Sequence, residues 1–235
     1  ARLHALPASR VLPAGAADPY SVHRFVIGRE LTETATRVAV STRSSLFVVL
    51  LAAYNLLASQ LTGESDLAVP IFTAGRTEPR FAGVVGPLYN FLPIRTDLGG
   101  CGSFVDVIAR TRASCLQAYA NDIPFRLIQA QAGDLMGPCG DDHLAVSSFE
   151  MFPPPALAGI ERAGDIRYSE LRGSHTSRPV GASTPKGILW ALDHLRSGEL
   201  AALIRFSRDR FDEGAIARIA TQFRQVLSAS VAEPT

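Results

Sequence analysis

The stretch SLFVVLLAAYNLLASQLTGESDLAVPIFT, residues 45–73, decides the fold because it joins a buried helix directly to a strand. Its first part is apolar on almost every side, so we expect a helix that is covered on most faces. Ser44 or Ser45 is placed to cap that helix, and Gly63 stands where a left-handed residue ends it. The β-rich run from Asp66 to Thr73 then predicts a strand.

Further elements are expected on both sides of this stretch. Residues 1–20 are rich in Ala, Pro and Gly and are predicted to form an extended linker. Periodicities of 2 and 3.6 residues place the elements that follow. The first two are a strand at Val22–Ile27 and a helix with Leu31, Ala35, Val38 and Ala39 on one face. After the central stretch come a strand at Leu88–Thr96 and a helix that begins with a capping box of Ser103 and Asp106. The inner face of that helix is expected to hold Phe104, Val107, Ile108, Thr111, Cys115 and Tyr119, and Pro124 opens a short further helix.

The last third of the chain adds more strands and a final helix. Leu144–Phe152 is an apolar stretch in loop-like surroundings, and Ile166–Leu171 is a further strand candidate. Ile188–Leu195 and Leu200–Ser207 flank a short polar turn and predict a β-hairpin. Asp212 caps a helix with an inward stripe of Ile216, Ile219, Ala220, Phe223 and Leu227. Strands and helices alternate, so we predict one α/β domain with a mixed sheet.

Composition narrows the classes of function. The net charge is +1 and no basic run occurs, so no nucleic-acid or anionic membrane partner is expected. The apolar run Leu46–Ala58 is interrupted by Asn55 and is short for a span of about 20 residues. Ala1–Pro19 has prolines and charges where a signal peptide would be apolar. Three scattered cysteines indicate reduced thiols rather than disulfides, and we expect a cytoplasmic protein.

The histidines do not by themselves reveal a reaction. None of His4, His23, His143, His175 and His194 has the spacing of a metal site, and we expect no metal. A solvated or hydrogen-bonded role explains His143 and His194 better than catalysis does. Nucleophile elbows, phosphate loops and dinucleotide fingerprints are also absent from the sequence. The residues alone therefore predict an α/β domain without a stated function.

A set of ordered stretches resembles the C-terminal half of nonribosomal peptide synthetase condensation domains. The stretches are residues 45–76, residues 84–98 (VVGPLYNFLPIRTDL), residues 103–128 and residues 203–223. The second stretch resembles the family pattern Gly-x-Phe-x-Asn-x-x-x-x-Arg through Gly86, Asn90 and Arg95, and the third holds the family's Pro-Phe segment at Pro124 and Phe125. The resemblance depends on the order of the set rather than on any one stretch.

Two features depart from the family pattern. The catalytic signature His-His-x-x-x-Asp-Gly is absent, because no two histidines are adjacent in the sequence. The resemblance implies that this signature lies before Ala1. The Arg-Asp-x-Ser-Arg-x-Pro-Leu segment is replaced by GDLMGPCGDDHLAVSSF, residues 133–149. That replacement favours a divergent or free-standing condensation enzyme over a standard elongation domain.

The resemblance implies a chloramphenicol-acetyltransferase-like lobe, the second half of a two-lobed, V-shaped domain with a tunnel between the lobes. Residues 1–20 are then a linker from the N-terminal lobe, and residues 21–235 are the C-terminal lobe. Within this lobe we expect a floor loop at about 74–85 and a segment within 144–184 that crosses to the other lobe. Carrier proteins bring the substrates on phosphopantetheine arms, and no other cofactor is expected.

The resemblance also assigns site residues, none of them catalytic. Gly75 and Arg76 open the floor loop, and Arg76 is the first choice to pair with the signature's aspartate across the lobes, because a guanidinium holds a carboxylate bidentately. Arg95 is the second choice, and an ordinary surface arginine is the alternative for either. Other tunnel or cross-lobe candidates are Gly86, Asn90, Ser147 and Glu150. Asn90 is expected to fix strand geometry, and Pro124 with Phe125 to start a helix and fill the core.

The function implied is acyl transfer from a carrier-bound thioester to an amine or hydroxyl acceptor, with this chain inactive alone. One alternative is a non-catalytic lobe of the same fold that docks carrier proteins. The other is an acyltransferase that uses coenzyme A thioesters.

Overall fold

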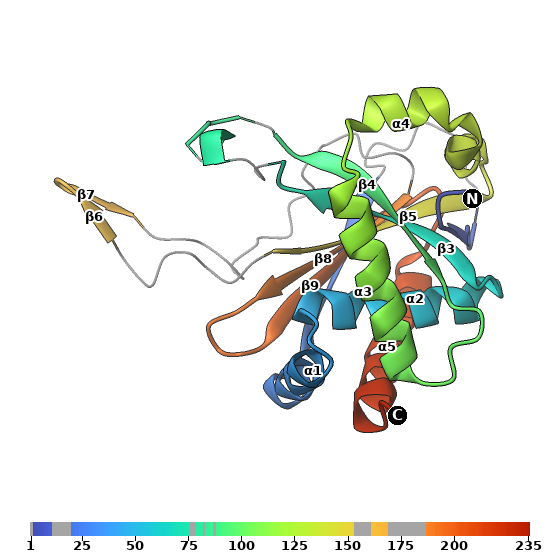
Figure 1. The fold of residues 1–235 in the computed structure, drawn as a ribbon, viewed down its shortest axis with the longest axis horizontal. Coiled ribbons are helices and arrows are strands. Elements are labelled where there is room, and N and C mark those ends of the chain that lie inside the picture. Colours follow the sequence, from blue (N-terminus) through green and yellow to red (C-terminus); the bar gives the residue numbers. More distant parts are fainter. Residues whose placement is uncertain are drawn as a thin grey trace.

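A computed structural model describes residues 2–10, 20–75, 79–81, 83–86, 88–152, 161–168 and 187–235. Its centre is a five-stranded sheet in the order β1-β5-β8-β9-β2 (Figure 1). Only β5 and β8 run parallel, so the sheet is mixed, as predicted. The strands are β1 (Ala5–Pro7), β2 (Tyr20–Ile27), β5 (Leu144–Phe152), β8 (Gly187–His194) and β9 (Leu200–Ser207).

A second ladder extends the sheet at its β1 edge. It consists of β3 (Asp66–Thr73) and β4 (Asn90–Asp97), which pair antiparallel over their full lengths. Leu3 forms a parallel bridge with Ala68 of β3, and the backbone N–H of His4 donates to the carbonyl of Ala68 at 2.7 Å. Leu3 and His4 therefore connect the two ladders. The expected linker over residues 1–20 is therefore wrong for residues 2–10, which are part of the fold. Residues 11–19 lie outside the described residues.

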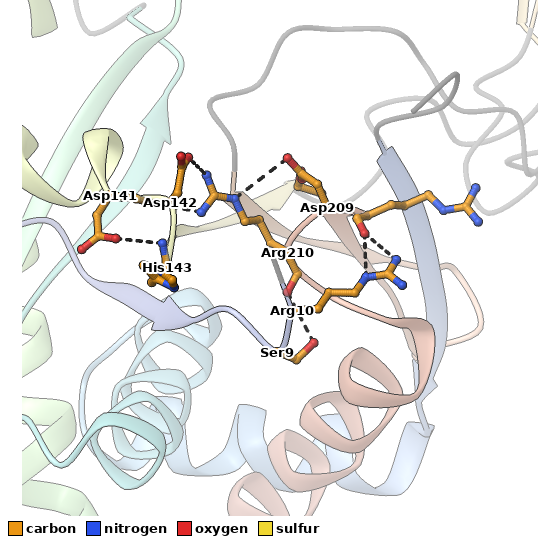
Figure 2. Close-up of polar contacts among 9 residues, drawn as sticks. Ser9, Arg10, Asp141, Asp142, His143, Asp209 and Arg210 are labelled. Atoms are coloured by element: carbon orange, nitrogen blue, oxygen red, sulfur yellow. Dashed lines mark hydrogen bonds and ion pairs between the residues drawn. The ribbon is translucent and has the colours of Figure 1, made fainter. Parts of the chain in front are cut away.

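Polar contacts around Arg210 hold the N-terminal segment at a second point (Figure 2). The Arg210 side chain is only 3% exposed, and its guanidinium donates to the Asp142 carboxylate at 2.5 Å. The Ser9 hydroxyl donates to the Arg210 carbonyl at 3.3 Å, and the Arg10 Nε donates to the Arg208 carbonyl at 2.8 Å. These contacts tie residues 9 and 10 to the turn between β9 and the last helix.

The long helices form where the sequence predicts them. They are α1 (Arg29–Ser41), α2 (Leu46–Thr62), α3 (Phe104–Ala120) and α5 (Glu213–Ala232). Ser45 caps α2, Gly63 ends it in the left-handed conformation, and Ser103 with Asp106 forms the expected capping box of α3. Of the residues expected on the inner face of α3, Tyr119 differs: it lies near the end of the helix and is 44% exposed.

The main core lies between α2, α5 and one face of the five-stranded sheet. Leu50, Leu51 and Leu57 of α2 are at most 1% exposed. Burial of side chains of this size contributes about 1.5–3 kcal/mol each. The aromatic rings of Tyr54, Phe149, Trp190 and Phe223 pack together there, with centroids of contacting pairs 5.2–6.4 Å apart. A helix that is apolar all round is thus enclosed, as residues 45–73 predict.

The segment predicted to cross to another lobe, within 144–184, begins with regular structure. Leu144–Phe152 is the strand β5, which lies between β1 and β8, and the crossing to another lobe stays a prediction. The residues of β5 from Ala145 to Phe149 are buried, as expected for an inner strand of a sheet. Further on, β6 (Glu161–Ala163) and β7 (Ile166–Tyr168) form a small hairpin apart from the sheet (Figure 1). Residues 153–160 and 169–186 lie outside the described residues.

Three short helices complete the described structure. The 3₁₀ turn η1 (Pro79–Phe81) lies within the predicted floor loop. The helix α4 (Phe125–Gln131) follows Pro124, as predicted, and the 3₁₀ segment η2 (Gly133–Gly140) occupies a stretch expected to be a loop. α4 and η2 contact each other, and they lie beside β4 and β5 respectively.

Candidate functional site

A cavity of about 740 Å³ lies against the face of the five-stranded sheet that is opposite the main helical core. The alternation along β5 defines this face, because successive side chains of a strand point to opposite sides. Ala145 and Phe149 are buried in the helical core. Val146, Ser148 and Glu150 line the cavity instead. Ligand pockets typically enclose about 300–1,000 Å³, so this cavity has room for a small-molecule group.

Aromatic side chains from β3, the β3–β4 loop, β4 and α4 form one wall of the cavity. Phe72 and Phe91 lie edge to face with ring centroids 5.2 Å apart, and Phe91 meets Phe125 in the same way at 4.7 Å. Tyr89 contacts Phe72 at 5.9 Å. All four rings line the cavity. Phe125 was expected to fill the core; it is only half-buried, because α4 lies at the edge of the fold and turns this ring toward the cavity.

Asn90 fixes the position of this wall. Its amide nitrogen donates to a carboxylate oxygen of Asp122 at 2.6 Å and to the carbonyl of Ile123 at 2.8 Å. Its side-chain oxygen accepts from the backbone N–H of Phe125 at 3.0 Å. One amide therefore ties the first residue of β4 to the start of α4. Asn90 is not among the cavity-lining residues, which agrees with the expected structural role.

Glycines allow the chain to turn between β3 and β4. Gly75 has φ of 60°, and a Cβ built there would lie 1.7 Å from the carbonyl oxygen of Leu88. Only glycine therefore permits this close approach of the two ends of the loop. Gly86 also has positive φ, is exposed, and lies near the other end of the same loop.

Glu150 is the acidic group of the cavity. Burial raises the pKa of its carboxyl to about 7. Within the described part of the chain, no hydrogen bond or ion pair engages this carboxyl. The other polar lining groups include Ser148, whose hydroxyl donates to the carbonyl of Ile188 at 3.2 Å, and Cys139, whose thiol pKa is raised by burial. Arg205 also lines the cavity, with its guanidinium 5.0 Å from the centroid of the Tyr20 ring.

The remaining predicted site residues do not meet at the cavity. Ser147 is three positions from Glu150 on the same strand, so it points to the opposite face, where its hydroxyl accepts a hydrogen bond from Tyr54 in the core. Arg95 is exposed and donates three hydrogen bonds to Asp66, at 2.9, 3.2 and 2.7 Å. Asp66 keeps a lowered pKa because of this contact. Arg76 lies outside the described residues.

The histidines in the described segments play no part in lining the cavity. His4 is 1% exposed, and burial lowers its pKa to about 4. Neither ring nitrogen of His4 has a hydrogen-bond partner in the described structure, and the ring lies edge-on to Tyr54 with centroids 6.0 Å apart. Over the described ranges, no group of three or more metal-binding side chains occurs.

One membrane-related observation concerns α1 and α2. No single helix of the described chain is long and apolar enough to cross a membrane. Together the two helices reach the length and composition of a span, but they are bent by 105° at their junction.

The sequence did not reveal most of the cavity. The aromatic wall, Ser148 and Arg205 come from elements distant in the chain. One pattern in the sequence indicates part of the cavity. Along residues 144–152, Val146, Ser148 and Glu150 recur at a spacing of two, which places the charged residue on the same face of a strand as the other two.

Comparisons with known proteins agree with this fold. The profile of the Condensation domain family matches residues 3–137. The chain is 30% identical over 231 residues to the probable non-canonical nonribosomal peptide synthetase CymA of Salinispora arenicola, and 29% identical over 235 residues to chondramide synthase cmdD of Chondromyces crocatus. Each match covers 97% of this chain, but only 3% and 6% of the two synthetases.

Among solved structures, the SgcC5 protein from Streptomyces globisporus superposes with a TM-score of 0.90 at 34% identity. The superposition covers 99% of this chain and 52% of SgcC5, which was crystallised with (R)-(-)-1-(2-naphthyl)-1,2-ethanediol and sucrose. The chain thus spans about half the length of SgcC5 and a small part of the synthetases.

Proposed function

Since this chain belongs to the condensation domain family of nonribosomal peptide synthetases, we propose that it is the C-terminal lobe of an acyltransferase. The proposed reaction joins an acyl or aminoacyl group, held as a thioester on a carrier protein, to an amine or hydroxyl acceptor. The acceptor attacks the thioester carbonyl, the C–S bond breaks, and the carrier thiol leaves with a proton. The family has the chloramphenicol-acetyltransferase-like fold, and the mixed sheet with flanking helices is consistent with it.

The cavity on the uncovered sheet face carries this proposal. An apolar, aromatic-lined space of about 740 Å³ suits the organic part of an acyl or acceptor group. Holding the two reactants in place is a large part of what such an enzyme has to do, because orientation alone lowers a bimolecular barrier substantially. In this proposal the cavity forms one wall of the reaction channel, and the phosphopantetheine arm brings the thioester to it.

The proton-handling group is proposed to come from another segment. None of the described cavity-lining residues is a histidine, and the sequence has no adjacent histidine pair. We place the His-His-x-x-x-Asp-Gly signature on the N-terminal lobe, with its imidazole acting on the acceptor. Arg76 remains the first choice to pair with the signature's aspartate. Arg95 is less suited, because its guanidinium already holds Asp66.

A cavity-filling variant tests the proposal. Leu189 lines the cavity from β8, and Leu189→Trp would occupy part of the space. Val40 on α1 is 73% exposed and away from the cavity, so Val40→Trp is the matched control. In an enzyme completed with an N-terminal lobe, we expect Leu189→Trp to reduce condensation at least tenfold and Val40→Trp to leave it unchanged. Full activity of Leu189→Trp would contradict the assignment of this cavity.

The identity of the donor is tested in the same assay. Carrier-bound and free coenzyme A thioesters of one acyl group are compared at equal concentration, and we expect product only from the carrier-bound donor. Faster turnover of the coenzyme A thioester would favour the coenzyme A-dependent alternative. If neither donor reacts and a carrier protein still binds, the non-catalytic docking lobe is favoured.

A further inference from the structure

Glu150 is the one acidic residue among the described residues that line the apolar cavity. It projects from β5 two residues before the end of the strand, and the facing residue of β8 is the small Ala191. Its strand neighbours on the same face are Ser148 and Phe152, which also line the cavity. A carboxylate removed from water is costly unless a cation or hydrogen-bond donors compensate it.

No compensating group is found among the described residues. Arg205 lines the same cavity from β9, but in the register of the sheet it aligns with Leu189 and Ser148, not with Glu150. The thiol of Cys139 and the phenol of Tyr89 approach from η2 and the β3–β4 loop. Asp193 lies in a smaller adjoining cavity of about 240 Å³ and has the same sign of charge as Glu150. Among the described residues, Glu150 therefore has no ion-pair partner, and Arg205 is the one cation that lines the same cavity.

We infer that Glu150 is a specificity-determining residue. It makes the cavity prefer a ligand that has an aromatic ring and a protonated amine. This inference rests on the proposed function, since the ligand would be a reactant whose ammonium group is not the attacking nitrogen, such as the aminoacyl group of the donor. The ring of the ligand packs against Phe72, Phe91 and Phe125, where offset and edge-to-face contacts are available. The ammonium group donates hydrogen bonds to the Glu150 carboxylate, which relieves the cost of burying that charge.

The preference for an amine follows from the charge. A hydroxyl group donates one neutral hydrogen bond, whereas an ammonium group also brings the opposite charge into a poorly solvated site. Hydrogen bonds to charged groups contribute about twice as much as neutral ones. Glu150 positions the ligand in this account and takes no part in bond formation.

Calorimetry with two probes tests the inference without any acyl donor. The probes are 2-phenylethylamine and 2-phenylethanol, which share a ring and differ in the polar group. At pH 8 we expect the protein to bind the amine at least about tenfold more tightly than the alcohol. Glu150→Gln should remove this preference by weakening only the amine. Glu33→Gln, an exposed carboxylate on α1, should leave both affinities unchanged.

A pH series on the unmodified protein gives a second measurement that needs no variant. The pKa of Glu150 is about 7, so its carboxyl is mostly ionised at pH 8 and mostly protonated at pH 6. The amine affinity should fall about tenfold between these values, since only the ionised form pairs with the cation. The affinity of the alcohol should change less than threefold.

Three results would overturn the inference: equal affinities for amine and alcohol, equal weakening of both by Glu150→Gln, or no binding of either probe at millimolar concentration. Because no thioester is present, these results are independent of the condensation assay. Amine selectivity without condensation would support the ligand preference of Glu150 and contradict the proposed function, whereas condensation without amine selectivity would support the proposed function and contradict the inference.

Discussion

Replacing Asn90 with alanine is expected to loosen the aromatic wall of the cavity. The substitution removes three hydrogen bonds, to the Asp122 carboxylate, the Ile123 carbonyl and the Phe125 N–H. At about 0.5–1 kcal/mol for each partly exposed bond, the loss in unfolding free energy is about 2 kcal/mol. α4 has only seven residues, so it depends on such contacts more than on its own helix propensity.

Two measurements check this prediction. Urea unfolding gives the loss of global stability, and hydrogen exchange of the Phe125 amide gives the local loss, expected as at least tenfold faster exchange. Asn121→Ala is the matched control, because its side chain makes one local bond, to the Gln117 carbonyl at 2.8 Å. It should cost about 0.5 kcal/mol. Unchanged Phe125 exchange in Asn90→Ala would refute the assignment of Asn90 as the support of this wall.

Three further substitutions probe the core and its attachment to the N-terminal segment. Tyr54→Phe removes the buried hydrogen bond to Ser147 and should lower the unfolding free energy by about 1–2 kcal/mol in urea. The pKa of His4 falls from 6.5 to about 4 on folding, so its contribution to the unfolding free energy is fully present above pH 6.5 and is lost as the pH drops toward 4. The unfolding free energy should therefore fall by up to about 3 kcal/mol between these pH values. His4→Leu should remove this part of the pH dependence of stability. Arg210→Met keeps an aliphatic stem but loses the contact with Asp142, and we expect a loss of about 2 kcal/mol.

Each of these has an exposed counterpart as its control. Tyr119→Phe, His143→Gln and Arg37→Met change the same kinds of side chain at exposed positions, and stability should shift by less than about 0.5 kcal/mol. If Tyr119→Phe were as destabilising as Tyr54→Phe, the buried hydrogen bond would not be the cause. A pH dependence that persists in His4→Leu would assign the acid sensitivity to other groups. An Arg210→Met protein as stable as the unmodified one would leave the ion pair between buried Arg210 and exposed Asp142 without a role in stability.

Local signals in the sequence were sufficient for most elements. The caps at Ser45 and Ser103, the terminating Gly63 and the hairpin of residues 188–207 were predicted because each depends on nearby residues only. Membership of the condensation domain family was also recognised from ordered motifs and is confirmed. These features share one property, namely that a short window of sequence contains the physical cause.

The misplaced features depend on contacts between distant segments. Residues 2–10 looked like a linker because their pairing partners, Ala68 and β5, are far away in the chain. Ser147 and Glu150 were proposed together, although an odd spacing on a strand separates them onto opposite faces. Residues 144–152 form a strand through their pairing with β1 and β8, so the sequence window alone does not show which faces Ser147 and Glu150 occupy. Arg76 and the domain boundaries stay predictions.

The central claim is that this chain supplies one wall of a reaction channel and that an imidazole from the other lobe handles the proton. The most direct measurement follows product formation by mass spectrometry, from a carrier-bound acyl thioester and an amine, with this chain alone and with an added condensation N-terminal lobe. We predict product only with the added lobe, and its loss when the second histidine of the His-His-x-x-x-Asp-Gly signature is changed to alanine. Product from this chain alone, or undiminished product after the histidine is changed, would contradict the claim.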